Sequence, residues 1–133
     1  MPLETHPDLE IISIIVEVEG KEPNIILVKG QDSVDVVIPG GVKYTMTLQF
    51  KVLNNKFENF TYKQNVKKLG VTVRSREVDM GTFEPSDEVY SYKFPPDETP
   101  GGWMMRGKYQ AVSTYFANGK QLIANDWTLE ITA

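Results

Sequence analysis

The sequence predicts an all-β protein, an antiparallel β-sandwich of about eight or nine short strands. Three observations support this prediction. Apolar and polar residues alternate over most of the chain, Gly, Pro and Asn residues interrupt the alternation at regular spacing, and no long segment has the 3.6-residue period of a helix. We expect at most one helical turn, near residues 54–58.

The clearest strand is VKYTMTLQFKV, residues 42–52. Its apolar side chains occupy every second position, and polar side chains occupy the positions between them. Such alternation is typical of a strand with one face on the core and one face in water. The same pattern recurs in RGKYQAVSTYF and in the C-terminal DWTLEIT, where the apolar face carries Trp127, Leu129 and Ile131.

The remaining predicted strands are shorter and are separated by turn residues. They are LEIISIIVEVE (9–19), NIILVK (24–29), VDVVI (34–38), FTYKQNV (60–66), GVTVRS (70–75) and VYSYKF (89–94), with a loop over 81–87. Asn118-Gly119 predicts a tight hairpin before the last strand, because this pair adopts the positive φ that such turns require.

Length and composition indicate one domain, residues 9–133, after a short N-terminal tail of residues 1–8. The chain has no cysteine, which excludes disulfides and thiolate sites. It has no apolar run long enough for a membrane helix, and MPLETHPDLE lacks the features of a secretion signal. We therefore expect a cytoplasmic protein.

The net charge of −4 disfavours nucleic acid and suits a basic protein partner. One basic cluster stands out, formed by Lys67, Lys68, Arg74 and Arg76. A solvated strand face explains this cluster better than a phosphate-binding patch does.

No catalytic or metal-binding residues are predicted, and no cofactor. The single histidine, His6, lies in the N-terminal tail, which we expect to be frayed and solvated, and the glycines match no phosphate-binding loop. The acidic pairs, such as Glu77 with Asp79, are typical of solvated loops. The protein is not expected to be an enzyme.

Binding is the remaining class of function. PPDETPGGWMMRGKY places Trp103, Met104 and Met105 directly after an exposed Pro- and Gly-rich loop. These large, adaptable side chains either plug one end of the core or line a cavity for an apolar ligand. Composition and periodicity leave both readings open.

Several motifs occur in a distinctive order. They are LNNKFENFTYKQNVKKLGVTV (53–73), MGTFEP (80–85), the segment 90–109 with Pro95, Glu98, Pro100 and Gly102 before MMRGKY, and NDWTLEI (125–131). Together they resemble the Rho GDP-dissociation inhibitor family, from about Pro7 to the C-terminus. The resemblance implies an immunoglobulin-like sandwich that binds the geranylgeranyl tail of GDP-bound Rho- or Rac-family small GTPases, extracts them from membranes and inhibits GDP release. It also implies a monomer that does not insert stably into membranes.

The resemblance implies site residues as well. The lipid-binding positions would be Leu48, Phe50, Tyr62, Val71, Val73, Met104, Ala111 and Trp127, with Trp103 and Met105 at the rim. The positions facing the basic tail of the GTPase would be Glu77, Asp97 and Glu98.

The sequence also departs from the family pattern. Asn125 stands where the family has a first tryptophan, and only about nine residues precede the first strand, whereas family members carry an N-terminal arm that contacts the GTPase. If this protein works without that arm, inhibition of nucleotide exchange should be weak. Two alternatives remain, a phosphodiesterase-delta-type carrier that recognises the prenyl group alone, and a closed interaction module without a lipid slot.

Overall fold

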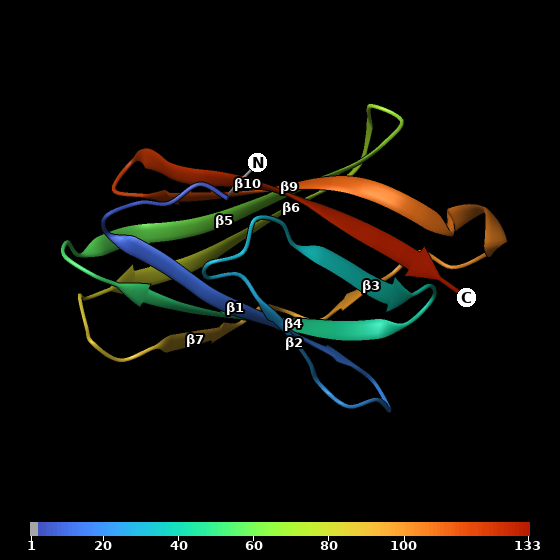
Figure 1. The fold of residues 1–133 in the computed structure, drawn as a ribbon, viewed down its shortest axis with the longest axis horizontal. Coiled ribbons are helices and arrows are strands. Elements are labelled where there is room, and N and C mark those ends of the chain that lie inside the picture. Colours follow the sequence, from blue (N-terminus) through green and yellow to red (C-terminus); the bar gives the residue numbers. More distant parts are fainter. Residues whose placement is uncertain (1–2) are drawn as a thin grey trace.

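Two five-stranded sheets pack face to face in the computed structural model, which describes residues 3–133 (Figure 1). The first sheet contains β1 (Leu9–Val18), β2 (Asn24–Leu27), β4 (Lys43–Val52), β7 (Tyr90–Lys93) and β8 (Asp97–Glu98). The second contains β3 (Asp35–Pro39), β5 (Phe57–Lys68), β6 (Val71–Phe83), β9 (Gly107–Ala117) and β10 (Lys120–Thr132). The all-β sandwich is confirmed.

Four details differ from the sequence prediction. The extra strand, β8, has only two residues, and β6 continues through the predicted loop as far as Phe83. Strand β3 pairs with β10 in parallel, so the second sheet is mixed. The one helical turn among residues 3–133 is a 3₁₀ turn, η1 (Trp103–Met105), whereas residues 54–55 form a bend. Gly102 directly precedes η1 and has a φ of 92°, a backbone conformation that favours glycine.

The predicted alternation is confirmed in the strands that form the core. In β4 the buried side chains are Met46, Leu48, Phe50 and Val52. The ring of Phe50 packs against Phe60 of β5 at 5.1 Å and Phe83 of β6 at 5.0 Å between centroids. These contacts join the two sheets and fill the interior at the end of the sandwich remote from η1.

The Asn118–Gly119 hairpin is also confirmed, with φ values of 56° and 74° between β9 and β10. The side chain of Asn118 does more than shape the turn. Its Oδ1 accepts a hydrogen bond from the backbone N–H of Glu58 at 2.9 Å, and its Nδ2 donates to the carbonyl of Lys56 at 3.0 Å. The turn therefore fixes the start of β5.

The N-terminal segment packs against the sandwich and is not frayed. The backbone N–H of Glu4 donates to Asn125 Oδ1 at 2.8 Å, and the N–H of Ala124 donates to Glu4 Oε1 at 3.0 Å. His6 is half-buried, and its Nδ1 accepts from the N–H of Asp8. Residues 1 and 2 of the predicted tail lie outside the described residues.

Candidate functional site

An apolar slot opens between the two sheets at the end of the sandwich that carries η1. Its volume is about 320 Å³, within the range of small-molecule sites. Strands β4, β5, β6, β9 and β10 and the loop 98–105 all contribute to it. Its apolar lining residues are Tyr44, Val66, Val73, Pro100, Met104, Met105, Tyr109, Leu129 and Ile131, and its polar ones are Gln64, Lys68, Arg74, Glu98 and Thr99.

Two other clefts are larger than the slot, but polar groups make up a greater share of their lining. One, of about 440 Å³, lies beside the N-terminal segment and is lined by apolar side chains together with polar ones, among them Glu4, Glu10 and Asp32. The other, of about 430 Å³, lies over β5, β6 and β9, where charged and amide side chains such as Lys63 and Glu77 line it. Both suit water. The slot is therefore the stronger candidate for an apolar ligand.

The slot continues toward the middle of the sandwich. A small cavity of about 40 Å³ shares Tyr44, Gln64, Thr99 and Leu129 with it and reaches the indole of Trp127. A further space of about 20 Å³ also borders Trp127 and is lined by Leu3, Ile14 and Val34 among others. Trp127 and Ile14 therefore border both inner spaces.

A directed chain of hydrogen bonds holds the inner end of the slot. Trp127 Nε1 donates to Ser113 Oγ at 2.8 Å, Ser113 Oγ and the Tyr62 hydroxyl are 2.7 Å apart, and the Tyr62 hydroxyl donates to Gln64 Oε1 at 2.7 Å. Burial raises the pKa of Tyr62 well above its usual value, although the Ser113 hydrogen bond opposes this. The phenol therefore stays neutral, and it orders the indole through Ser113.

Two residues of η1, Met104 and Met105, lie at the rim of the slot, and Trp103 beside them is not among the lining residues. None of Trp103, Met104 and Met105 is buried, and Met104 and Met105 both line the slot. The hydroxyl of Tyr109 donates to the carbonyl of Met105 at 2.5 Å and ties the turn to β9. Of the two readings of PPDETPGGWMMRGKY, the structure supports the lining of a cavity, since no residue of the turn fills the core.

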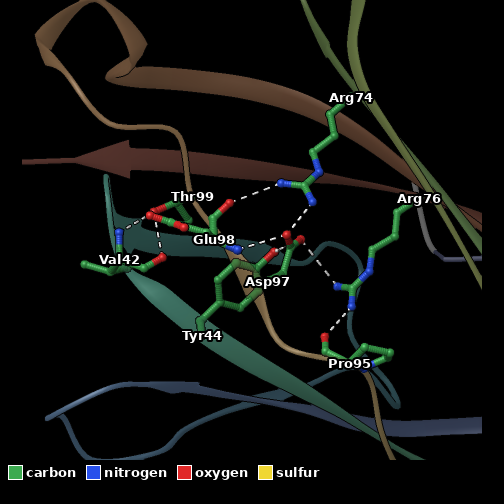
Figure 2. Close-up of polar contacts among 8 residues, drawn as sticks. All are labelled: Val42, Tyr44, Arg74, Arg76, Pro95, Asp97, Glu98 and Thr99. Atoms are coloured by element: carbon green, nitrogen blue, oxygen red, sulfur yellow. Dashed lines mark hydrogen bonds and ion pairs between the residues drawn. The ribbon is translucent and has the colours of Figure 1, made fainter.

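A polar network closes the side of the sandwich next to the slot (Figure 2). Asp97 accepts hydrogen bonds from Arg74 Nη2, from the Tyr44 hydroxyl at 3.0 Å and from the Glu98 N–H at 2.9 Å, and Arg76 Nη1 lies 3.6 Å from it. Partial burial alone would raise the pKa of Asp97, but these hydrogen bonds and the Arg74 charge outweigh it and lower the pKa. Asp97 is therefore an anion that links the sheets.

The loop that follows is fixed by close backbone contacts. Thr99 Oγ1 donates to the carbonyl of Pro39 at 2.7 Å and accepts from the N–H of Val42 at 3.1 Å. The N–H of Gly41 donates to the carbonyl of Pro100 at 3.1 Å. At Gly40 a side chain would meet that same carbonyl at 3.0 Å. The slot therefore has a firmly positioned wall on this side.

The structure distributes the predicted site residues over three environments. Val73, Met104 and Glu98 line the slot. Leu48, Phe50, Tyr62 and Ala111 are buried in the core, and Trp127 stands half-buried at the inner end. Val71 is exposed outside the slot, and Glu77 lies on the outer cleft with its carboxylate 4.0 Å from Lys63 Nζ. Their roles in binding stay predictions.

Sequence reasoning missed several lining residues, namely Tyr44, Gln64, Val66, Thr99, Tyr109, Leu129 and Ile131. Most of them had a usable signal. Leu129 and Ile131 share the inward face of Trp127, and Tyr44 shares that of Leu48. Period-two patterning predicted that these side chains face inward, but it gave no information on which end of the sandwich is open.

Comparisons with known proteins agree with one another. A family model described as “RHO protein GDP dissociation inhibitor” matches residues 3–133. A “Probable rho GDP-dissociation inhibitor” of Caenorhabditis elegans is 35% identical over 98 residues, which cover 73% of this chain and 51% of that protein. “Rho GDP-dissociation inhibitor 1” of Arabidopsis thaliana is 31% identical over 109 residues, covering 79% and 45%. The chain thus spans about half the length of these relatives.

More distant matches support the same picture. “Rho GDP-dissociation inhibitor 1” of Homo sapiens is 27% identical over 96 residues, covering 71% of this chain and 47% of that protein. Among solved structures, a Niemann-Pick type C2 protein from Japanese carpenter ant matches with a TM-score of 0.56 and 9% identity, over 99% of this chain and 100% of that one. That likeness concerns the fold alone. Among residues 3–133, no helix has the length and apolar character to cross a membrane.

Proposed function

The chain belongs to the Rho GDP-dissociation inhibitor family, and from this premise we propose that it binds the geranylgeranyl tail of a Rho-family small GTPase between its two sheets. The observation that carries the proposal is the apolar slot, which opens beside Met104 and continues inward to Trp127. The eight positions predicted to bind lipid include two that line it, Val73 and Met104.

The energetics of the ligand support a slot of this kind. Transfer of a geranylgeranyl chain from a membrane to water costs roughly 10 kcal/mol or more of free energy, at about 0.8 kcal/mol per CH₂. A protein that extracts it must therefore offer a comparable apolar surface. Side chains from five strands supply that surface here, and methionines at the entrance adapt to a flexible chain.

Regulation of a GTPase, rather than catalysis, is the activity that goes with this family. Extraction from the membrane follows from competition between the slot and the bilayer for the prenyl group. Inhibition of GDP release is the second part of the proposal and is measured separately, by nucleotide exchange on the prenylated GTPase. Among residues 3–133, no cluster of three or more histidine or acidic side chains could hold a metal ion.

One observation favours a second candidate function, a carrier of the phosphodiesterase-delta type that recognises the prenyl group alone. The Asp97 carboxylate, predicted to face a basic GTPase tail, is already engaged by Arg74 and Arg76. A carrier that ignores the tail would need no available carboxylate there. Peptides with basic and neutral tails separate the two candidates.

The test is a fluorescence titration of the chain with a labelled, geranylgeranylated and methylated cysteine peptide, beside the same peptide without the lipid. We expect saturable binding that requires the lipid. Met104→Asp should weaken it about tenfold or more, because the new charge would be desolvated at the slot entrance. Leu27→Asp, at an exposed position of β2 outside the slot, is the matched control. Equal binding of both peptides, or none, would refute the proposal.

A further inference from the structure

The most exposed apolar side chains of the molecule gather around the slot entrance. Among residues 3–133, the four large hydrophobic side chains with the greatest exposed fraction are Leu69 (96%), Trp103 (76%), Met104 (71%) and Val71 (64%). We call these four residues the mouth patch. Trp103 and Met104 belong to η1, and Leu69 and Val71 belong to the tip of the β5–β6 hairpin. In Figure 1 both segments lie toward the right-hand end of the sandwich, where the hairpin tip projects upward and η1 lies at the far right.

A contact connects the two halves of the mouth patch. Lys68 Nζ donates to the carbonyl of Arg106 at 3.3 Å and lies 4.9 Å from the centre of the Tyr109 ring. The hairpin is thereby held against the segment that follows η1. The segments that carry both halves also border the slot, because Lys68 and Val73 of the hairpin and Met104 of η1 line it.

The backbone conformation of Leu69 indicates that its exposed side chain has a role in binding. Leu69 adopts a φ of 52°, in a turn with Gly70 at 81°. A non-glycine residue pays about 1 kcal/mol or more for this left-handed conformation, and asparagine and glycine are the usual occupants. A leucine placed there, with nearly its whole side chain in water, costs stability and offers no packing in return. This is the pattern of a contact side chain.

The charges around the mouth patch have the opposite sign to the chain as a whole. Lys67, Lys68, Arg106 and Lys108 lie at this end of the molecule, although the net charge of the chain is −4. Two carboxylates accompany them, Glu98 at the slot and Glu130 across the β9–β10 ladder from Lys108. The local balance is therefore positive around exposed tryptophan, methionine and leucine.

We propose that the mouth patch docks on the surface of an anionic lipid bilayer. Tryptophan partitions to the membrane interface, neighbouring aliphatic side chains enter the acyl boundary, and lysine and arginine meet the anionic headgroups. Docking in this orientation places the slot entrance against the leaflet, so that a prenyl group leaves the bilayer directly into the slot. That purpose rests on the proposed function, whereas docking itself requires no prenylated partner.

The experiment uses the chain alone with vesicles of phosphatidylcholine, with and without phosphatidylserine, in a flotation assay at low and high salt. We expect binding to the anionic vesicles that weakens with salt, with a blue shift of the Trp103 emission. Leu69→Ser combined with Trp103→Ser should lower binding roughly tenfold or more. Lys67→Glu combined with Arg106→Glu should lower it by a similar factor. Ile25→Ser with Leu27→Ser, two comparably exposed residues of β2, is the matched control and should bind normally.

Two outcomes would overturn the inference. One is the absence of binding to anionic vesicles at low salt. The other is an equal loss of vesicle binding in the Leu69/Trp103 variant and in the β2 control variant. A third result would replace the inference with another one. If the protein does not bind vesicles, but Leu69→Ser combined with Trp103→Ser weakens its binding to a prenylated GTPase in vesicle-free solution, the mouth patch is a protein contact. Neither Leu69 nor Trp103 lines the slot, so the prenylated-peptide titration with the same variant tests the proposed function independently.

Discussion

The guanidinium of Arg74 on β6 donates a hydrogen bond to the carboxylate of Asp97 on β8, and this pair joins the two sheets beside the slot (Figure 2). Arg74 also donates to the carbonyl of Glu98 at 3.2 Å, and Arg76 donates to the carbonyl of Pro95 at 2.6 Å. Two neighbouring arginines of an edge strand thus hold one short segment of the other sheet. This network therefore holds Arg74 and Glu98, which both line the slot, close to each other.

Replacing Asp97 by Asn should destabilise the protein by about 1–3 kcal/mol, since it leaves Arg74 and Arg76 without their anion. The cost should depend on pH. The folded-state pKa of Asp97 is lowered, so its stabilisation is present above the unfolded value of about 4 and is lost as pH falls through the folded pKa. Urea unfolding across this acid range measures both effects. Glu77→Gln, in the exposed pair with Lys63, should change stability by less than about 0.5 kcal/mol.

Alkaline titration should reveal the buried tyrosines. Burial, with the nearby Asp97 charge, raises the pKa of Tyr44 to about 12, and burial also raises those of Tyr62 and Tyr115. The stability linked to these groups is therefore fully present below pH ~10 and is lost as pH rises through their folded values. Tyrosinate absorbance should rise in two stages in the native chain and in one stage in urea. A single stage near pH ~10 with native circular dichroism retained would contradict this.

The strand pattern was predictable because each sheet has one face on the core and one face exposed to solvent. Alternation along β4, β9 and β10 follows from that geometry and predicted their inward side chains. The parallel pairing of β3 with β10 was not predictable. The segment VDVVI alternates equally well in either direction, and its partner is set by the connection from β2 across to the other sheet.

Glu98 should be the residue that senses a basic tail on the ligand. No hydrogen bond or ion pair in the described part of the chain engages its side-chain carboxylate, whereas that of Asp97 is occupied. Glu98→Lys should weaken a prenylated peptide with a basic tail roughly five- to tenfold at low salt and leave a neutral-tailed peptide unaffected. Glu58→Lys, at an exposed position of β5 outside the slot, is the matched control. Equal losses for both peptides would instead support recognition of the lipid alone.

Gly40 should be intolerant of a side chain although its backbone conformation is ordinary. A Cβ there would lie 3.0 Å from the carbonyl oxygen of Pro100 and 3.1 Å from Ile131 Cγ2, and both residues line the slot. We expect Gly40→Ala to cost about 1–3 kcal/mol and to weaken lipid binding severalfold. At Gly101 the nearest atom is 3.6 Å away, so Gly101→Ala should be nearly neutral. Thermal unfolding and the prenylated-peptide titration measure the two effects.

The candidate site was less predictable than the fold, for a physical reason. Leu48 and Phe50 face inward just as Tyr44 does, and only packing at the two ends of the sandwich separates core from slot. Aromatic rings from β4, β5 and β6 fill one end, whereas at the other end the slot lies beside Thr99 and Pro100 of the loop after β8. Arg74 and Arg76, read as a solvated strand face, proved to be partners of Asp97. That contact joins residues of two different sheets, which local patterning does not register.

Trp127 should set the length of prenyl chain that the slot accepts. Trp127 borders both the inner cavity of about 40 Å³ and the space of about 20 Å³ beside Leu3. Trp127→Leu should merge these spaces and lengthen the slot, at a cost in stability of about 2–4 kcal/mol. We therefore expect the ratio of geranylgeranyl to farnesyl affinity to rise severalfold, measured with two peptides that differ only in the lipid.

Ser113→Ala provides the control for that ratio. It removes the acceptor of the Trp127 Nε1 hydrogen bond and the partner of the Tyr62 hydroxyl, so it should destabilise the protein by about 1–3 kcal/mol. It leaves the indole in place, however, and should not change the preference between the two lipids. A ratio that is unchanged in Trp127→Leu, or that rises equally in Ser113→Ala, would mean that the slot ends before Trp127 and that the inner cavities are packing defects of the core.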